Sequence, residues 1–250
     1  MLNILPQEIE QIKSLRDKVA DIISPYYDTD FNLLRWLKKY NFDFNEALLN
    51  LRAHLEFRNS NWHPDKVVDG HRDHPVHKHS QITITGNAVK TPNSIVCIEQ
   101  TGRIDYWGIL HTFPVNEIMK ALIYDYENML KKVMEQEAET GEQTSILYIM
   151  DLSELQYNAQ LLEILQGSFP AIVTFISEHY EEIIQCFVIV NAPLFMSAIW
   201  TIVSPFLPIR IKNKIKILGS NWKGEILEMA IPNVLPSSWN IPGQDPVYTE

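Results

Sequence analysis

The sequence has only two cysteines, Cys97 and Cys186, and both lie in apolar runs. Two such thiols favour reduced core residues of a cytosolic protein over a disulfide or a metal pair. The N-terminal segment lacks a basic stretch followed by an unbroken apolar run, so it does not resemble a secretory signal. The longest apolar segment, 193–207, is about 15 residues long, short of the ~20 needed to cross a bilayer. We therefore expect no membrane-spanning helix.

Positive charge is in deficit. The chain has 21 lysines and arginines against 31 aspartates and glutamates, which gives a formal net charge of −10. This balance leaves no long basic face and argues against general nucleic-acid binding. The 250 residues, 46% of them hydrophobic, suffice for a sizeable core. We expect one large domain, or a large domain with a small companion.

Motifs of catalysis and phosphate binding are also missing. The nucleophile elbow G-x-S-x-G does not occur, because Ser220 in LGSNW lacks the second glycine. Neither G-x-G-x-x-G nor the P-loop motif is present. Asp151 closes a predicted strand but has no evident histidine partner, and we interpret Asp151 and Glu154 as caps of the following segment. These absences indicate a binding protein rather than an enzyme.

A histidine-rich stretch, DGHRDHPVHKHS, is a candidate zinc site, because imidazole is a preferred zinc ligand. Its histidines are His71, His74, His77 and His79. Pro75 interrupts any helical spacing between them, and the flanking sequence is typical of a loop. A zinc site and a solvated connector that binds metal only adventitiously are both open, and we favour the connector, with no metal or organic cofactor.

The apolar spacing predicts helices first and then an alternation of strands and helices. The expected helices of the N-terminal part are Pro6–Ser24, Phe31–Tyr40 (capped by Asp28 and Asp30) and Asn45–Arg58. The expected strands are Ile95–Glu99, Tyr106–His111, Ile146–Asp151 and Phe187–Val190. The later helices are Asn116–Glu139, Gln160–Glu182 with a break near Pro170, Pro193–Leu207 and Glu225–Ala230, before a tail that wraps the surface. This order predicts an α/β fold with a mixed or parallel sheet covered by helices.

The helix Pro193–Leu207 is apolar almost all round, which suits a helix buried on every side or one that meets lipid. Apolar stripes are more often core than ligand cavity, but this helix carries more apolar surface than one sheet face requires. A basic cluster follows it directly, consisting of Arg210, Lys212, Lys214, Lys216 and Lys223. An apolar helix followed by cations, in an acidic chain, indicates lipid binding.

Several blocks resemble the CRAL-TRIO (Sec14-like) lipid-binding and lipid-transfer family, over roughly residues 28–240. DTDFNLLRWLKKYNFDFNEALLNLRAHLEFRN is similar to the family's N-terminal helices. YIMDLSEL, SFPAIVTFISEHYEEII, FVIVNAPLFMSAIWTIVSPFLPIRIKNKIKILGSNW and IPNVLPSSW are similar to its lipid-binding domain. The resemblance implies an N-terminal helical (CRAL-TRIO N) domain at 1–62, a connector at 63–93, the lipid-binding domain at 94–240 and a tail at 241–250.

The family resemblance further implies a floor of strands and a deep apolar pocket closed by a mobile gate helix, here Ala192–Leu207. Its ligands include phosphoinositides, phosphatidylcholine, tocopherol, retinoids and sterol-like molecules, none of which is turned over. The pocket residues expected here are Tyr106, Tyr148, Met150, Phe169, Ile172, Phe175, Ile176, Phe195, Ile199, Trp200, Val203 and Phe206.

The family's headgroup pattern for phosphatidylinositol is only partly present. Glu182 and Lys214 match its glutamate and lysine and are the candidate headgroup residues; an ion pair at the surface is the equal alternative. The other positions differ, with Glu181, Ile211 and the pair Tyr40-Asn41 in place of the proline, the threonine and an Arg-Lys pair. The closing glycines of the family are also absent from LPSSWN. The incomplete pattern therefore slightly favours a neutral isoprenoid or sterol-like ligand over phosphatidylinositol.

A lipid with some thirty methylenes would lose ~20 kcal/mol or more on entering water, at ~0.8 kcal/mol for each methylene. Exchange must therefore occur on a membrane, where Phe195, Ile199, Trp200 and Val203 would swing outward into the interface. The cations expected to face anionic headgroups are Arg210, Lys212, Lys216 and Lys223, unless they form only a solvated edge. We expect a cytoplasmic monomer in transient contact with membranes; the alternative is an interaction or regulatory scaffold whose bound lipid is structural.

Overall fold

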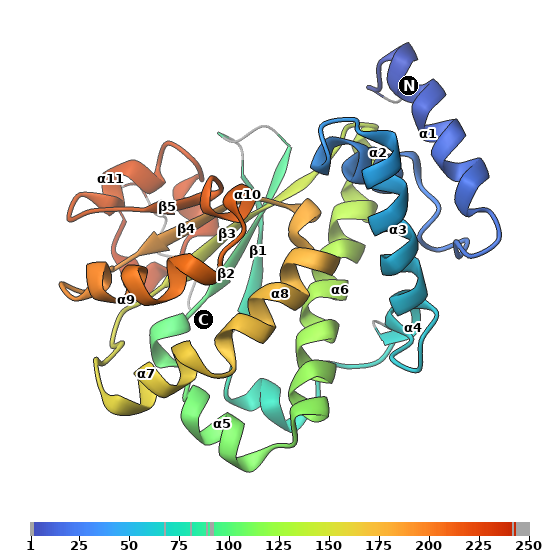
Figure 1. Ribbon diagram of the computed structural model, residues 1–250. Helices are drawn as coiled ribbons and strands as arrows, with labels where there is room; N and C mark the ends of the chain where they lie inside the picture. The colour runs from blue at the N-terminus through green and yellow to red at the C-terminus, as the bar shows by residue number, and fades with distance from the viewer. Residues whose placement is uncertain are drawn as a thin grey trace.

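The computed structural model describes residues 3–67, 69–80, 82–88, 90, 93–241 and 243. Three helices form an N-terminal unit beside the long helix α6 (Figure 1). They are α1 (Pro6–Val19), α2 (Asp30–Lys39) and α3 (Phe44–Arg58). The Thr29 hydroxyl accepts a hydrogen bond of 3.1 Å from the Asn32 amide and caps α2. The predicted caps Asp28 and Asp30 bind the Arg16 guanidinium instead, at 2.6 and 2.7 Å.

A five-stranded sheet forms the centre of the molecule, with its strands in chain order. The first pair is antiparallel and the remaining pairs are parallel, so the sheet is mixed and the predicted α/β class is confirmed. The strands are β1 (Ile82–Ala88), β2 (Ser94–Glu99), β3 (Ser145–Asp151), β4 (Ile184–Val190) and β5 (Ile215–Ile217).

Helices connect and cover these strands. In chain order they are α4 (Pro64–Val67), η1 (Pro75–Lys78), η2 (Thr101–Arg103), α5 (Tyr106–Thr112), α6 (Val115–Thr140), α7 (Ala159–Gln166), α8 (Phe169–His179), η3 (Glu181–Ile183), α9 (Met196–Val203), η4 (Ser204–Phe206), α10 (Ile209–Lys212), α11 (Trp222–Ile226), η5 (Pro232–Val234) and η6 (Ser237–Trp239). Within the described residues, no single helix has both the length and the apolar character to cross a bilayer. The α7–α8 pair passes that test only jointly, across a bend of 43°.

One predicted strand is wrong. Residues 106–111 belong to helix α5, because the Asp105 carboxylate accepts a hydrogen bond of 2.9 Å from the Gly108 amide and starts the helix. The antiparallel edge position is filled instead by β1, which lies in the span 63–93 predicted as a connector. The other three predicted strands are confirmed as parts of β2, β3 and β4. The division of the chain into domains stays a prediction.

The two faces of the sheet carry different cores. On one face, inward residues such as Val96, Leu147 and Val188 pack against the C-terminal segment, whose ring pair Trp222 and Trp239 lies 5.0 Å apart. The described part of the predicted surface tail is anchored in this core by Leu235, Trp239 and Ile241, whereas its other residues are exposed or half-buried. Residues 242 and 244–250 of the predicted tail lie outside the described residues.

Asp151 fastens this C-terminal segment to the sheet. Its carboxylate accepts hydrogen bonds from the Trp239 indole (3.0 Å), the Asn191 amide (2.8 Å) and the backbone of Ser153 (2.9 Å). The bond to Ser153 closes the turn after β3, whereas the next helix, α7, is capped by Asn158, whose Oδ1 accepts a hydrogen bond of 2.8 Å from the Leu161 amide. Glu154 instead pairs with Arg103 at the surface.

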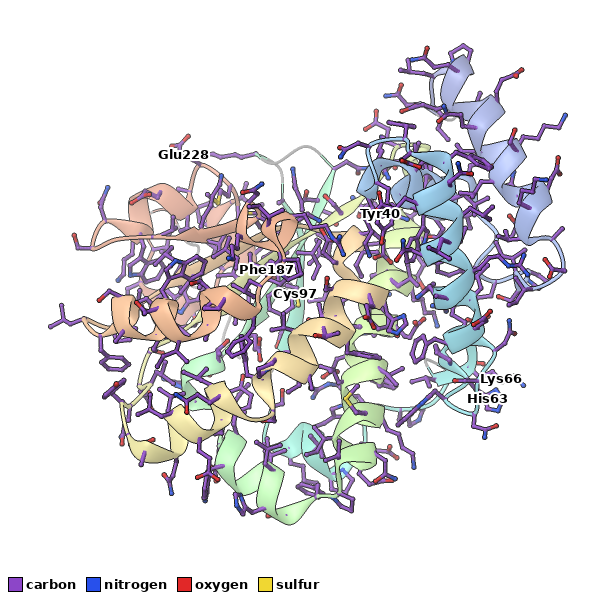
Figure 2. All side chains as sticks on the ribbon, in the orientation of Figure 1. Tyr40, His63, Lys66, Cys97, Phe187 and Glu228 are labelled. Atoms are coloured by element: carbon purple, nitrogen blue, oxygen red, sulfur yellow. The ribbon has the colours of Figure 1, made fainter. Side chains whose placement is uncertain are left out.

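The opposite face of the sheet looks toward α6 and α8, and Figure 2 labels two of its residues, Cys97 and Phe187. Both cysteines are free thiols, Cys97 buried and Cys186 half-buried. The core on this face continues without interruption into the N-terminal unit through residues such as Trp36. The N-terminal unit therefore forms one wall of the space above the sheet.

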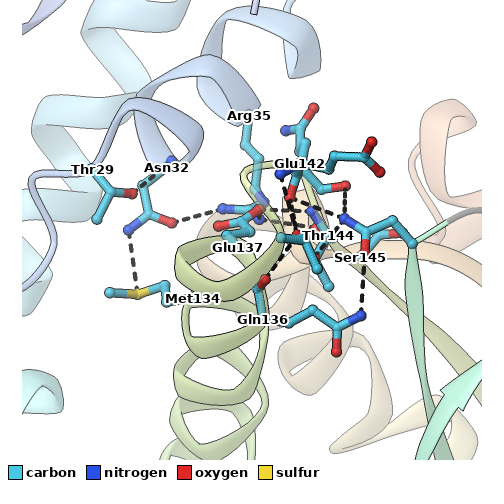
Figure 3. Close-up of polar contacts among 12 residues, drawn as sticks. Thr29, Asn32, Arg35, Met134, Gln136, Glu137, Glu142, Thr144 and Ser145 are labelled. Carbon is cyan, nitrogen blue, oxygen red and sulfur yellow. Dashed lines mark hydrogen bonds and ion pairs between the residues drawn. The ribbon is translucent and has the colours of Figure 1, made fainter. Parts of the chain in front are cut away.

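A buried polar junction joins the N-terminal unit to α6 and β3 (Figure 3). The Arg35 guanidinium donates to Asn32 Oδ1 (2.8 Å) and to the Thr144 carbonyl (2.9 Å), and it is ion-paired with Glu137. Burial raises the pKa of Glu137, and Arg35 opposes this shift. Because every partner is buried and hydrogen-bonded, the junction holds α2 in a single position against the sheet.

Candidate lipid-binding face

Helices α7, α8 and α9 enclose an apolar cluster in front of β4 and β5. Its buried members are Leu165, Val173, Ile199, Val203, Leu207 and Ile211. Six predicted pocket residues stand around the main core or this cluster with partial exposure, including Phe169, Phe195 and Trp200. The break between α7 and α8 falls at Gly167, close to the predicted position near Pro170.

The structure brings most of the predicted pocket residues into two adjoining groups. Phe169, Phe195, Ile199, Trp200 and Val203 belong to the cluster of α7, α8 and α9. Tyr148, Met150, Phe175 and Ile176 belong to the main core above the sheet. Phe187, which the sequence did not indicate as a pocket residue, belongs to both and lies 5.6 Å from the Tyr148 ring.

The remaining three predicted pocket residues lie outside these groups. Tyr106 contacts Glu99, as described below. Ile172 is half-buried on α8, and Phe206 is 42% exposed on η4. Phe206 therefore faces solvent in this structure rather than the interior.

The face between α8, α9 and the sheet keeps much of its apolar surface uncovered. Of the 11 residues of α8, only Val173 and Ser177 are buried, although the helix is rich in large apolar side chains. Phe175 and Ile176 on this helix and Met150 on β3 are all half-buried. Partly exposed apolar side chains on facing elements are typical of a ligand-binding groove rather than of a filled core.

The two best-defined hollows in the described part of the chain lie elsewhere. One of about 310 Å³ lies between β1 and α6, and one of about 260 Å³ lies beside β4 and β5, where Lys214 and Lys216 line it. No predicted pocket residue lines either of them. The apolar face is thus distinct from both hollows.

The two candidate headgroup residues do not pair with each other. Lys214 Nζ lies 2.6 Å from Glu181 Oε1, whereas Glu182 Oε2 lies 3.4 Å from Lys39 Nζ. The Lys39 and Glu182 side chains are only 1% and 3% exposed, so their contact is buried. Burial raises the pKa of Glu182 and lowers that of Lys39. The alternative of a surface pair between Glu182 and Lys214 is therefore wrong.

Glu181 is the centre of this charged network. Its carboxylate binds Lys214, the Arg210 guanidinium at 2.9 Å and, at 3.8 Å, Lys39. Burial alone would raise the pKa of Glu181, but the surrounding cations outweigh burial and lower it. Arg210 also stacks over the Tyr40 ring at 5.6 Å, between α10 and α2, where Figure 2 labels Tyr40. Sequence reasoning missed this role of Glu181, because HYEE does not show which glutamate faces which cation.

Of the cations predicted to face a membrane, Arg210 is thus engaged within the protein. Lys216 and Lys223 are exposed, and Lys212 is half-buried. Two large apolar side chains that were not among the predicted site residues stand in solvent around α9, Leu194 before it and Ile209 after it, and the predicted pocket residue Phe206 is exposed beside them. Ile199 and Val203, expected to swing outward, are packed inward here.

The predicted histidine stretch does not converge on a point. His74 Nε2 lies 2.9 Å from Glu117, and His77, which is buried rather than solvated, lies 3.1 Å from the Ala121 carbonyl. His71 and His79 are exposed. Among the residues that the structure describes, no three His, Cys, Asp or Glu side chains come together as metal ligands would.

A second pair of histidines links the N-terminal unit to α8. His54 Nδ1 on α3 lies 3.1 Å from His179 Nδ1, and the His179 ring stacks on Phe57 at 4.1 Å. Burial, together with the charges of Lys39 and Arg58, lowers the pKa of His179 to about 4 and that of His54 well below its usual value. Both rings are therefore neutral at pH 7.

Acidification should destabilise this histidine pair. Unfolded His179 gains a proton near pH 6.5, whereas the folded form resists protonation until about pH 4. The free energy of unfolding should therefore be intact above pH 6.5 and fall by about 2–3 kcal/mol as the pH drops from 6.5 to 4. Urea denaturation at several pH values measures this slope.

The matched variants separate this effect from the titration of carboxylates. His179→Phe should reduce the slope, whereas His63→Asn should not, because His63 is exposed on the far side of the N-terminal unit (Figure 2). Equal slopes in the wild type and in His179→Phe would contradict the prediction.

Comparisons with known proteins agree with the fold. The family profile of the CRAL/TRIO domain matches residues 88–240. A CRAL-TRIO domain-containing protein of Caenorhabditis elegans is 31% identical over 236 residues, which cover 91% of this chain and 56% of that protein. A phosphatidylinositol/phosphatidylcholine transfer protein of Arabidopsis thaliana is 20% identical over 221 residues, 86% of this chain and 38% of that protein.

The crystal structure of Sfh5 superposes with a TM-score of 0.65 at 13% identity and covers 87% of this chain and 82% of that one. A mixed sheet behind an apolar, helix-covered face, together with the family profile, defines a CRAL/TRIO domain. The chain belongs to the CRAL-TRIO, or Sec14-like, family of lipid-binding and lipid-transfer domains. It spans 56% and 38% of the lengths of the two relatives described above.

Proposed function

We propose that this chain binds a hydrophobic lipid on the apolar face between α8, α9 and the sheet, and carries or presents it at membrane surfaces. The observation that carries the proposal is the partial exposure of large apolar side chains, such as Phe175, Trp200 and Phe187, on facing walls. Burying such groups against lipid methylenes provides ~0.8 kcal/mol for each methylene. No catalytic turnover is part of this proposal.

The helix α9 and its flanks, residues 192–207, act as the gate in this proposal. Trp200 is half-buried on the inner side, and Leu194 and Phe206 are exposed beyond the two ends of the helix. These exposed apolar side chains would enter the membrane interface, where an outward movement of α9 would open the lipid-binding face. The protein would act as a cytoplasmic monomer that touches membranes transiently.

The charged network shapes the choice of ligand. Glu182 and Lys214 stay our proposed headgroup contacts, but both already have protein partners. A phosphorylated headgroup would have to displace Glu181 from Lys214 to reach that cation. This cost favours a neutral isoprenoid or sterol-like lipid over phosphatidylinositol.

Two measurements on the purified full chain test the proposal. Native mass spectrometry should detect protein with a bound lipid, and extraction should identify that lipid. A transfer assay between donor and acceptor liposomes, loaded with the identified lipid, should show transfer faster than the spontaneous rate. Protein that is always empty and does not accelerate transfer would refute the carrier function.

The second candidate is an interaction scaffold with a structural lipid. It is favoured by one observation, that the two best-defined hollows lie away from the apolar face while Ile199 and Val203 already close part of that face. A lipid that stays bound and is never exchanged in the transfer assay would support the scaffold.

Membrane contact should depend on the exposed cations beside α9. Each cation near an anionic surface contributes about 1 kcal/mol, so reversing Lys212, Lys216 and Lys223 to glutamate should weaken binding to phosphatidylserine liposomes by ~10-fold or more. Co-sedimentation at physiological salt measures this binding.

The matched control reverses three exposed lysines, Lys13 and Lys18 on α1 and Lys66 on α4. These two helices lie on the side of the molecule away from α9 (Figure 1). The two triple variants have the same net charge. Equal binding by both variants would show that the position of these charges does not matter and would remove the basic membrane edge.

A further inference from the structure

A carboxyl group stands within the apolar face, and no ion pair found among the described residues involves it. Glu99 ends β2 and points to the same side of the sheet as Cys97, with Met150 of β3 opposite it in register. Its two oxygens accept hydrogen bonds from two phenols, Tyr148 at 2.8 Å and Tyr106 at 3.1 Å. These three side chains come from β2, β3 and the first turn of α5.

The surroundings of Glu99 oppose negative charge. Burial raises its pKa, against the opposing hydrogen bonds from Tyr148, Tyr106 and Thr101, and the Asp125 carboxylate raises it further. The same environment raises the pKa of the Tyr106 and Tyr148 phenols, so both remain proton donors. A buried polar group with no cation is costly to keep, and such costs are typical of functional sites.

The group around Glu99 is also only partly enclosed. Glu99, Tyr106 and Met150 are each half-buried, whereas residues preceding Glu99 in β2 are buried. A carboxylate has about four acceptor positions, and hydrogen bonds from Tyr148, Tyr106 and Thr101 leave at least one of them free. A polar atom of a ligand lying along Met150 and Phe187 would meet a free position.

We propose that Glu99, Tyr106 and Tyr148 together bind the polar end of the lipid, and that this end is an uncharged hydroxyl group. The inference rests on the proposed lipid-binding function and names its ligand class. Both phenol protons already point to Glu99, so the site offers acceptor positions on the Glu99 carboxyl group and on the phenol oxygens, and a hydroxyl group can donate to them. A carboxylate or a phosphate would meet Glu99 as a like charge in a partly desolvated site and would be rejected.

The test compares probes that share one hydrocarbon skeleton. All-trans-retinol and all-trans-retinoic acid are titrated into the full chain at pH 7.4, and binding is followed by quenching of tryptophan fluorescence. We expect retinol to bind about 10-fold more tightly or better. In Glu99→Gln the preference should shrink to about 3-fold or less, mainly because retinoic acid binds more tightly once the charge is removed.

Two further variants separate recognition from folding. Tyr106→Phe should weaken retinol binding by a few-fold, because it removes one phenol and keeps the ring. Glu154→Gln removes an exposed carboxylate beyond β3 and should leave the preference unchanged. The wild-type comparison needs no variant, so a failure of Glu99→Gln to fold would not block the test.

The outcomes are distinct. Equal binding of the two probes, or a preference that Glu99→Gln leaves unchanged, would overturn the hydroxyl site and leave the lipid-binding function standing. Tighter binding of retinylamine than of retinol would also overturn it, in favour of a cationic ligand end. If neither probe binds while extraction yields an anionic phospholipid, the site is overturned and lipid binding stands. No probe binding and no extracted lipid would overturn both.

Discussion

Replacing Arg58 by methionine is expected to lower the free energy of unfolding by about 3–5 kcal/mol. The Arg58 guanidinium makes a bidentate contact with Glu127, at 2.8 and 3.0 Å, and its Nε donates to Asp65 at 2.7 Å. Arg58 is 2% exposed and Glu127 is fully buried, so the variant would leave a carboxylate without its cation in the core between α3 and α6. Urea denaturation at pH 7 measures the loss.

The matched control is Arg103→Met, which breaks the exposed pair with Glu154 and should cost no more than about 1 kcal/mol. A double variant, Arg58→Met with Glu127→Leu, should recover part of the stability, because it removes the orphaned charge as well. Glu127 also accepts the Tyr180 hydroxyl at 2.9 Å, so the recovery should be incomplete. Equal losses in Arg58→Met and Arg103→Met would contradict a buried pair.

Replacing Lys39 by methionine should have a similar effect, again about 3–5 kcal/mol. Lys39 Nζ donates to the Ser177 carbonyl at 2.8 Å and is the ion-pair partner of buried Glu182. Glu181 would keep Lys214 and Arg210, so Glu182 alone would lose its compensating charge. Thermal and urea unfolding at pH 7 measure the effect.

Adding Glu182→Gln to Lys39→Met should restore part of the stability, because the isosteric amide carries no charge. Lys120→Met is the control, since Lys120 pairs with Glu117 at the surface and should change stability by about 0.5 kcal/mol or less. The pairing of Lys39 with Glu182 would be rejected if Glu182→Gln worsened the Lys39→Met variant as much as it worsens the wild type.

Strands buried on both faces were the part of the fold that the sequence predicted best. The β-branched runs of β3 and β4 give that signal directly, because parallel strands under helices are apolar on both sides. Residues 106–111 misled the prediction, since aromatic and aliphatic residues suit either element, and the deciding contact is the Asp105 cap. The strand β1 was missed although ITIT alternates, because a polar, glycine-containing edge strand has a weak apolar signal.

The candidate site was predicted in its apolar part and missed in its polar part. Apolar residues such as Phe175 and Trp200 can be identified in the sequence from their residue type and their spacing on a helix. The contacts of Lys39 with Glu182 and of Tyr148 with Glu99 join residues 143 and 49 positions apart. Such pairings depend on tertiary geometry, so residue types alone do not reveal which cation faces which carboxylate.

Glu181 links α2 to α10 through its contacts with Lys39 and Arg210. This link constrains how α9 would have to move. Arg210 lies on the segment after the proposed gate, and both Glu181 and the Tyr40 ring hold it against the N-terminal unit. In the proposed opening this contact would anchor the downstream end of α9, and the movement would begin near Leu194, which projects into solvent. Opening would then be a rotation of α9 about its downstream end rather than a displacement of the whole helix. A chain without its first three helices would consequently lose the Tyr40 contact that helps to anchor this end of α9, as well as one wall of the apolar face.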